Sequence, residues 1–521
     1  MKKRFNVTGV CFLDQHYVAD TSAKFARITE MIEMGDYFTI NRPRQYGKTT
    51  MLFRLANALK QTGEYVVFRI SFEGVGDLVF ENENAFCEMF LDLLRIKAEQ
   101  QQETVLEQML NHVSLDTHDL KKLSSVISTL VHTAAGRKLV LFIDEVDKSS
   151  NNQLFLHFLD ILRDKYLERT ETPTFHSVVL VGIHDVKSLK LKLRPDEEKK
   201  FNSPWNIAAD FKVDMNLQPA EIAPMLEEYA QDRGVVVDTL AVAERLFYYT
   251  SGYPFLVSKL CKIFDEELLA EKTEKTWTTQ DVDIAARQLI GETNTNFDEL
   301  SKNLDNNPDL YQLTQSIAIE GEQYAFEPND PVASIGIQYG IFADRKGLAI
   351  HNRIYQEVIV NKMSFRVQRE HTRLINPYST PYSLPDHRLD VQKVILKFQE
   401  VMHAEYSPKE RDFLERQGRL FFLAFLKPIL NGHGHTFKEP QISEEKRLDV
   451  IITYYQHQYL IELKLWRGQQ AHEAGLDQLA DYLDRLGLNE GFLLIFDPRV
   501  NRDWKSEEVV HQGKRIFAVW V

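Results

Sequence analysis

Two widely separated groups of residues in this sequence have the types and spacing that chemistry on phosphates requires. The first lies in the run Gly47-Lys48-Thr49-Thr50, which ends a short loop and begins an apolar helical pattern. Backbone N–H groups at such a helix start face a polyphosphate, the lysine meets its β- and γ-phosphates, and the following hydroxyl binds Mg²⁺. We therefore expect Lys48 to contact phosphate and Thr49 to hold the metal ion. The residues expected to bind the nucleotide are Arg44, Gln45, Tyr46, Gly47, Lys48, Thr49 and Thr50.

One position of this loop departs from the general phosphate-loop pattern GxxxxGK[ST]. That pattern has glycine where this chain has Arg42. Because Gly-Lys-Thr alone is common in unrelated loops, an ordinary helix start that carries a surface lysine explains the run equally well. A second element is needed to decide between the two interpretations.

The second element is an apolar run that ends in Asp144 and Glu145. A short apolar run flanked by polar residues predicts a buried parallel strand, whose carboxylates emerge at the end where α/β sheets bind ligands. We expect Asp144 to hold the Mg²⁺ shell and Glu145 to polarise the attacking water. The alternative is an acidic cap after an ordinary core strand. The order of the Gly-Lys-Thr loop followed by this strand favours the nucleotide site over that alternative.

Further elements along residues 1–300 would place these groups in one sheet. Apolar residues at helical spacing and runs rich in β-formers alternate around the two motifs. His184 and Asp185 end one of the expected strands, where they would either sense the γ-phosphate or cap a helix. The expected helices cover residues 24–34, 50–59, 84–134 (broken around 114–118) and 154–167, and the expected strands cover residues 65–72, 174–185 and 211–215.

Composition limits the class of protein. In 521 residues no apolar run approaches the ~20 residues of a membrane span, and the N-terminus lacks the apolar core of a secretory signal. Three widely spaced cysteines exclude a disulfide framework and a cysteine zinc cluster, so we expect a cytoplasmic protein. The net charge of −14 argues against indiscriminate binding of nucleic acid. Residues 187–194 are a local basic candidate, although alternating Lys and Leu favours a solvated face.

The N-terminal part resembles bacterial AAA-like ATPases of the STAND and archaeal-ATPase branch. The loop Arg-Pro-Arg-x-x-Gly-Lys is typical of that branch, so Arg42 fits the family. The resemblance spans most of residues 1–300 and implies ATP and Mg²⁺ as cofactors. It rests on Asn41-Arg42-Pro43-Arg44-Gln45-Tyr46-Gly47-Lys48-Thr49, Asp144-Glu145, Ser203-Pro204-Trp205-Asn206 and Gly252-Tyr253-Pro254.

Helices dominate residues 216–300, where Gly252 and Pro254 interrupt the helical period and suit a lid. Residues 338–355 predict strand, turn, strand and helix, which suits the end of a winged helix. Such modules bind DNA or protein, and packing against the ATPase is the simpler use. Three prolines among polar residues predict a linker at residues 364–388.

The second chemical group lies in the C-terminal part and consists of Asp449, Glu462 and Lys464. Two strands joined by a short turn bring Asp449 and Glu462 within reach of a common point, and Glu-x-Lys alternation keeps Glu462 and Lys464 on one strand face. Two carboxylates suit one or two Mg²⁺ ions, and a lysine can orient the attacking water in phosphodiester hydrolysis. A solvent-facing charged pair on a hairpin would explain Glu-x-Lys alone.

The spacing Asp-x(12)-Glu-x-Lys is similar to the PD-(D/E)XK nuclease superfamily, whose fold is a mixed sheet flanked by helices. No proline precedes Asp449, which the superfamily tolerates, and such a fold is sometimes retained for binding only. The resemblance implies metal ligands at Glu415, Asp449 and Glu462, a water-orienting Lys464, and supporting contacts from Gln478 and Tyr482.

The sequence thus predicts an α/β protein: a P-loop NTPase parallel sheet with a helical lid and winged helix, followed by a small mixed α/β nuclease-like domain. We expect an ATPase that gates Mg²⁺-dependent cleavage of nucleic acid, with DNA as the expected partner. One alternative is a signalling or scaffold ATPase whose C-terminal domain binds DNA or protein without cleaving. Another is a helicase-like motor of a mobile element or defence system, which needs a trans-acting arginine, with Arg163, Arg169 and Arg194 as candidates. A homo-oligomer is a further expected partner. The expected domains are the ATPase core (1–215), lid (216–300), winged-helix module (301–363), linker (364–388) and nuclease-like domain (389–521).

Overall fold

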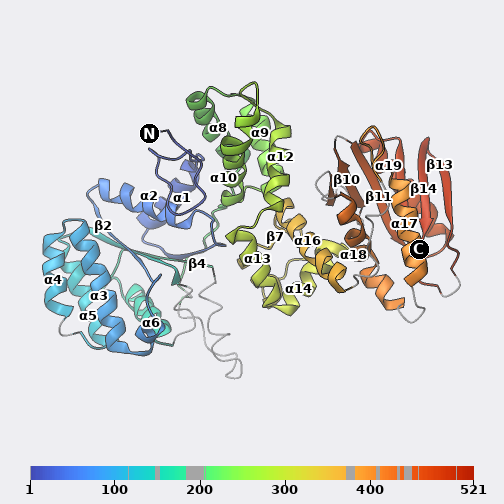
Figure 1. Cartoon of the computed structure of the whole chain (residues 1–521). Helices are drawn as coiled ribbons and strands as arrows, with labels where there is room; N and C mark the ends of the chain where they lie inside the picture. Colours follow the sequence, from blue (N-terminus) through green and yellow to red (C-terminus); the bar gives the residue numbers. More distant parts are fainter. Residues whose placement is uncertain are drawn as a thin grey trace. The chain divides into compact units, whose positions relative to one another are not determined.

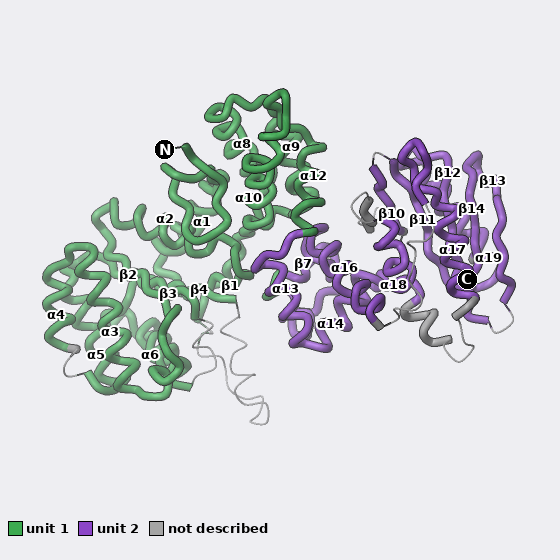
Figure 2. Tube along the Cα trace, in the orientation of Figure 1, with its two compact units in different colours: residues 1–291, 338–340 green, residues 292–337, 341–521 purple. Residues whose placement is uncertain are grey.

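The computed structural model of this protein forms two compact units (Figure 2). Unit 1 comprises residues 1–291 and 338–340, and unit 2 comprises residues 292–337 and 341–521. No helix in the described part of the chain is long and apolar enough to cross a membrane. The described residues are 2–114, 117–146, 153–183, 205, 207–370, 382–405, 411–430, 434–438, 449–455, 457–499 and 502–521.

A four-stranded parallel sheet lies at the centre of unit 1, in the order β1-β4-β3-β2, which confirms the expected α/β class (Figure 1). Its strand residues are almost all buried and rich in Val, Ile, Leu and Phe, as a parallel sheet covered on both faces requires. Because the strands are parallel, the loop after β1 and the carboxylate that ends β3 lie at one edge. The strands are β1 Tyr37–Asn41, β2 Tyr65–Ser71, β3 Lys138–Asp144 and β4 Ser177–Gly182.

Helices cover both faces of this sheet, and α3 to α6 share one apolar core with the strands (Figure 1). The stretch 84–134 was expected to break once and instead breaks twice. Gln102, at φ 59°, turns the chain after α3, and the side chain of Asp119 caps the first turn of α5 by accepting from the Lys122 N–H. The helices are α1 Ser22–Glu33, α2 Lys48–Gln61, α3 Glu83–Gln100, α4 Thr104–Ser114, α5 Leu120–Thr133 and α6 Gln153–Leu167, with a 3₁₀ turn η1 at Asp77–Glu81.

The last core strand, predicted at residues 211–215, does not form. Just before this segment, Ala209 forms an isolated parallel bridge with Phe38 of β1. Within the segment, the Arg42 guanidinium donates a hydrogen bond to the Val213 carbonyl at 2.8 Å. This side chain therefore occupies a backbone acceptor that pairing with a neighbouring strand would need. Phe211 stacks on Phe38 with ring centroids 5.9 Å apart, which holds the segment beside β1 without further pairing.

Helices dominate residues 216–291 of unit 1, as expected, beside one short parallel pair of strands, β5 with β6. Gly252 separates α9 from α10 in the left-handed conformation (φ 75°), and Pro254 occupies the first turn of α10, where its missing N–H costs nothing. The elements are α8 Pro219–Arg233, β5 Val236–Val237, α9 Thr239–Thr250, α10 Pro254–Ile263, the π-helical turn η4 Phe264–Leu268, α11 Leu269–Glu271, β6 Thr276–Trp277 and α12 Thr279–Gly291.

Unit 2 begins with helices and a small antiparallel hairpin, β7 with β8. The strand-turn-strand-helix order predicted for residues 338–355 is present. α16 continues through Glu370, so residues 364–370, expected in the linker, are helical. Met363, Ser364 and Val367 are buried, and this buried face carries the helix past the expected boundary. The elements are α13 Thr295–Asp305, α14 Pro308–Gln315, the π-helical turn η5 Ser316–Glu320, α15 Pro331–Gln338, β7 Phe342–Asp344, β8 Leu348–Ile350 and α16 Arg353–Glu370.

The C-terminal part of unit 2 is a six-stranded mixed sheet flanked by helices, in the order β13-β14-β12-β11-β10-β9 (Figure 1). α19 packs on the face that includes Leu493 and Ile495, whereas Phe398 of α17 and Gly418 of α18 meet Phe496 on the other face. The elements are α17 Val391–Glu405, α18 Arg411–Leu430, β9 Gly434–Lys438, β10 Asp449–Tyr454, β11 His457–Leu465, α19 Gln469–Arg485, β12 Glu490–Phe496, β13 Ser506–His511 and β14 Lys514–Trp520.

Candidate functional site

The loop between β1 and α2 has its left-handed residues at Gln45 (φ 60°) and Gly47 (φ 75°). Arg42 lies outside the left-handed region, so the loop does not need glycine at the position where the general pattern has one. A Cβ at Gly47 would meet no atom within 4 Å, and its glycine is therefore explained by backbone conformation rather than by space. The unusual residue in the motif is compatible with the fold of the loop.

Arg42 is a structural residue in this arrangement. Its guanidinium donates to the carbonyls of Asn41 and Val213, both at 2.8 Å, and lies 5.5 Å from the centre of the Phe211 ring. Burial lowers the pKa of Arg42. The side chain therefore fixes the loop entry to the segment beside β1.

Lys48 is the first residue of α2, and its side chain turns back into the loop. The ammonium donates to the carbonyls of Arg42 at 2.6 Å and Pro43 at 2.9 Å, and the side chain is buried. The N–H groups at the start of α2 and this ammonium make the loop a positively polarised region suited to an anion.

Thr49 and Asp144 meet although they are 95 positions apart. The Thr49 hydroxyl donates to Asp144 Oδ2, and the Glu145 N–H donates to Asp144 Oδ1, both at 3.1 Å. Burial raises the pKa of the Asp144 carboxyl, while these hydrogen bonds and the charge of Lys48 oppose that rise. Glu145 has φ 58°, an uncommon conformation for a residue other than glycine. The sheet thus brings the predicted metal-binding pair together.

Two tyrosines tie the loop to the helical region after it. The Tyr253 hydroxyl donates to the Arg44 carbonyl, and the Tyr46 hydroxyl donates to Asn216 Oδ1, both at 2.7 Å. The two rings lie edge to face with centroids 4.5 Å apart. Sequence reasoning singled out Gly-Tyr-Pro as a turn but missed this contact, because nothing in the spacing of Tyr253 shows which carbonyl it reaches.

Thr50 is engaged by the N-terminal segment, since its hydroxyl accepts from the Cys11 N–H at 3.1 Å. Two arginine-finger candidates have partners nearby: Arg163 pairs with Asp164 at 3.8 Å, and Arg169 lies over the Tyr166 ring at 3.9 Å. The predicted features that lie outside the described residues are His184, Asp185, Arg194, Ser203, Pro204, Asn206 and the basic run 187–194.

The second candidate site lies between the C-terminal sheet and α19. Asp449 and Glu462 are register partners in the antiparallel ladder of β10 and β11, as the short turn predicted. Lys464 Nζ lies 3.1 Å from Glu462 Oε1, and the Glu462 side chain is fully buried. The backbone of Glu415 belongs to α18, but the side chains of Glu415 and Asp449 lie outside the described part.

Gln478 and Tyr482 come from α19, the helix that covers this face. The Gln478 Oε1 atom is buried, and Tyr482 packs partly buried against the apolar core. A Cβ added at Gly475 of the same helix would lie 2.2 Å from Lys464 Nζ. Among the side chains that the structure describes, no group of three His, Cys, Asp or Glu is placed to hold a metal ion.

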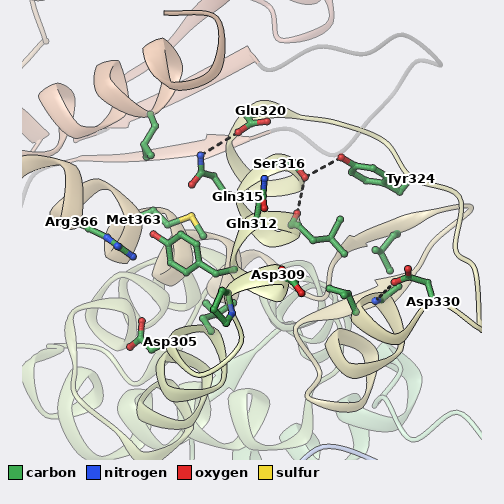
Figure 3. A pocket seen from close by; sticks show the side chains of 18 of the residues that line it. Asp305, Asp309, Gln312, Gln315, Ser316, Glu320, Tyr324, Asp330, Met363 and Arg366 are labelled. Carbon is green, nitrogen blue, oxygen red and sulfur yellow. Dashed lines mark hydrogen bonds between the residues drawn. The ribbon is translucent and has the colours of Figure 1, made fainter. Parts of the chain in front are cut away.

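A cavity of about 1290 Å³, which no sequence pattern predicted, opens in the helical part of unit 2 (Figure 3). The π-helical turn η5 lines it together with residues of α13, α14 and α16. Its charged side chains are mainly acidic. They include Asp305, Asp309, Glu320, Glu327, Asp330 and Arg366.

Comparison with known proteins adds a family to this geometry. Residues 9–332 match the family described as AAA-like domain. A curated relative, an uncharacterized WD repeat-containing protein of Synechocystis, is 25% identical over 289 residues, which are 50% of this chain and 22% of that protein. The chain therefore spans about a fifth of the length of this relative.

Three solved structures align with low TM-scores. The Walker-type ATPase of Pyrococcus abyssi is 10% identical, with TM-score 0.47 over 68% of this chain and 99% of that chain. The Aeropyrum pernix ORC2 protein is 13% identical, with TM-score 0.36 over 70% and 96%. The RuvB Holliday junction branch migration motor of Thermotoga maritima is 15% identical, with TM-score 0.32 over 65% and 93%.

Proposed function

This chain belongs to the AAA-like domain family, and on that premise we propose that it binds and hydrolyses ATP with Mg²⁺ as cofactor. The hydrogen bond between Thr49 and Asp144 carries the proposal, because it joins the phosphate loop to the carboxylate at the end of β3. A hydroxyl and a carboxylate are oxygen donors of the kind that Mg²⁺ prefers. These two residues would hold the ion, which neutralises charge on the phosphates when bound.

The remaining roles follow from position. Lys48 and the N–H groups at the start of α2 bind the phosphates, and residues 44–50 surround them. Glu145 follows Asp144 directly and polarises the attacking water. Arg42 stays out of this chemistry, because its guanidinium is committed to Asn41 and Val213.

For the C-terminal domain we propose a PD-(D/E)XK-type site that cleaves nucleic acid, most simply DNA. The register of Asp449 with Glu462 and the 3.1 Å contact of Glu462 with Lys464 support it. Asp449, Glu462 and Glu415 would hold Mg²⁺, whose role is to polarise the phosphate. Lys464 orients the water.

A non-cleaving scaffold is the second candidate, and one observation favours it. The Glu462 side chain has no exposed surface, and Lys464 is only 14% exposed. A buried ion pair of this kind also serves a purely structural role, in which the domain binds DNA or protein without cutting.

We propose the domain organisation predicted from the sequence, with one difference: residues 364–370, at the start of the predicted linker, are helical and continue α16. Three helices followed by the β7–β8 hairpin support a winged-helix module at residues 301–363. A cytoplasmic location, a homo-oligomer and a trans-acting arginine at Arg163, Arg169 or Arg194 complete the proposal.

The test measures cleavage of single- and double-stranded DNA by the full chain in Mg²⁺, with and without ATP, alongside ATP hydrolysis. Lys48→Ala removes the phosphate contact, and Glu462→Gln removes one charge while keeping the shape of the buried side chain. EDTA serves as the metal control, and thermal unfolding shows that each variant is folded.

Loss of cleavage in Glu462→Gln, with ATP dependence only when Lys48 is intact, would establish a coupled ATPase and nuclease. ATP hydrolysis without cleavage would select the scaffold. A cleavage rate that does not depend on ATP would show that the two activities are not coupled. Absence of ATP hydrolysis by the folded wild-type chain would overturn the proposal that this chain is an ATPase.

A further inference from the structure

Tryptophans and cations gather at one edge of the C-terminal sheet. β11, β12 and β14 pair in parallel, so their carboxyl ends meet at this edge. The N–H of Trp466, just after β11, donates to the Phe496 carbonyl at the end of β12 at 2.8 Å. We call this group the tryptophan edge, and its members are Trp466, Arg499, Arg502, Trp504, Lys505 and Trp520.

Each tryptophan of this edge has a cation over its ring. Arg499 and Lys505 keep 55% and 47% of their side chains exposed while they lie over rings that are partly or fully buried. Cation–π contacts orient such side chains. Carboxylates hold two of them as well: Arg499 forms an ion pair with Asp497 at 2.6 Å, and Lys505 Nζ lies 3.4 Å from Glu507 Oε2. The pairs are Arg499 over Trp466 (5.3 Å from guanidinium carbon to ring centre), Arg502 over Trp504 (4.7 Å) and Lys505 Nζ over Trp520 (4.0 Å).

The tryptophan edge is continuous with the candidate cleavage site. Lys464 and Trp466 are two residues apart on β11 and its extension, so they share a strand face. The His472 ring lies 5.8 Å from Trp466 and 5.3 Å from Trp520. Burial lowers the pKa of His472, the carboxylate of Glu507 at 3.6 Å from its Nε2 opposes this, and the charges of Lys505 and Lys464 lower the pKa further.

We propose that the tryptophan edge binds an unpaired strand of nucleic acid beside the candidate cleavage site. Trp466 and Trp504 are only partly buried, so a base can stack on the part of each ring that the arginine over it leaves uncovered, and the cations around them pair with phosphates. A duplex keeps its bases stacked inside and can use only the cations. The inference rests on the proposed nuclease function for the fate of the strand, whereas binding itself needs neither metal nor cleavage.

The cavity in the helical part of unit 2 shows the opposite chemistry. Figure 3 shows Asp305, Asp309, Glu320 and Asp330 around it, against a single labelled cation, Arg366. These negatively charged side chains would repel the phosphates of a nucleic acid. α15 of the proposed winged helix contains no Lys or Arg. The tryptophan edge therefore suits phosphates better than this cavity or α15 does.

The experiment measures binding of labelled oligothymidylate, and of a duplex of the same length, by fluorescence anisotropy in EDTA, so that cleavage cannot occur. The full chain is compared with Trp504→Leu, which stays apolar but loses the flat ring, with Trp504→Phe, which keeps one, and with Lys505→Ala. Tyr248→Ala is the matched control, because Tyr248 in unit 1 is 36% exposed and carries Arg245 over its ring at 4.5 Å.

We expect the single strand to bind at least about tenfold more tightly than the duplex and more weakly as salt rises. Trp504→Leu should lose about tenfold or more, Trp504→Phe should recover most of it, and Tyr248→Ala should bind like wild type. Equal affinity for duplex and single strand, or unchanged binding in folded Trp504→Leu and Lys505→Ala, would overturn the proposal. So would absence of nucleic-acid binding by wild type, which would point to a protein partner instead.

This experiment separates the two proposals. Strand binding in EDTA without cleavage in Mg²⁺ keeps the tryptophan edge and removes the nuclease. Cleavage that survives unchanged in Trp504→Leu, with unchanged affinity, keeps the nuclease and removes the tryptophan edge.

Discussion

The ammonium of Lys464 occupies the space that a side chain at Gly475 would need. A Cβ at position 475 would lie 2.2 Å from Lys464 Nζ and 3.0 Å from its Cδ and Cε. Gly475 is inside α19, where glycine is less favourable than alanine by about 1 kcal/mol. The helix that covers the site therefore also determines where Lys464 lies beside Glu462.

Gly475→Ala should lower Mg²⁺-dependent cleavage by tenfold or more, because the new methyl group displaces the lysine from Glu462, and tenfold corresponds to about 1.4 kcal/mol of barrier. The fold should survive, since a lysine chain can move aside and alanine favours the helix. Cleavage rates and melting temperatures check this. Gly291→Ala, also in a helix but with nothing within 4 Å of its Cβ, should behave like wild type. Full cleavage by folded Gly475→Ala would contradict a role for Lys464.

Tyr253→Phe should weaken ATP binding about two- to tenfold, the value of one ordinary hydrogen bond. The change removes the bond to the Arg44 carbonyl and keeps the ring packed on Tyr46. Titration with a fluorescent ATP analogue measures it, and Tyr248→Phe, on an exposed ring, is the control. An unchanged dissociation constant would show that the loop holds its shape without this contact.

Gly252→Ala should destabilise unit 1 by more than about 3 kcal/mol, because φ is 75° and a Cβ would lie 2.2 Å from the Leu217 carbonyl oxygen. Gly234→Ala isolates the backbone term: its φ is 63°, but nothing lies within 4 Å of its Cβ, so we expect a loss of about 1 kcal/mol. Denaturant titration compares the two. Equal losses would mean that the close approach to Leu217 relaxes.

Glu357→Gln should change how stability depends on pH. Burial raises the pKa of Glu357 from 4.5 to about 8, although Lys427 and Arg353 oppose this. The folded chain then holds a proton that the unfolded chain releases, so stability falls as pH rises from 4.5 to about 8, by up to about 1.4 kcal/mol per unit.

The variant should lose this fall, so its melting temperature should exceed that of wild type increasingly between pH 7 and about 8. His351, whose pKa burial lowers to about 3, contributes a slope of opposite sign below its ordinary 6.5 and stays outside this window. If the melting temperatures of the two proteins instead changed with pH in the same way, Glu357 would be charged in the folded state.

Local pattern was enough to predict the loop before α2, the strand ending in Asp144 and the hairpin of β10 with β11, because each depends on residues close in sequence. It was wrong at residues 211–215, where Arg42, far away in the chain, takes an acceptor from the ladder. It also missed Tyr253 with Arg44 and Gly475 with Lys464. Such contacts depend on how separate elements pack, and no spacing within either element records them.

The ladder of β10 and β11 has one more consequence. Tyr454 pairs with His457 next to the turn, and Asp449 pairs with Glu462 at the other end of the ladder. The number of residues in each strand between these two pairs therefore determines that Asp449 and Glu462 lie opposite each other. One residue inserted within β10, between Asp449 and Tyr454, would move the residues on one side of the insertion to the opposite face of the sheet. Substitutions in these strands can be tolerated singly, whereas insertions and deletions cannot, and chain length here is as much a part of the site as any side chain.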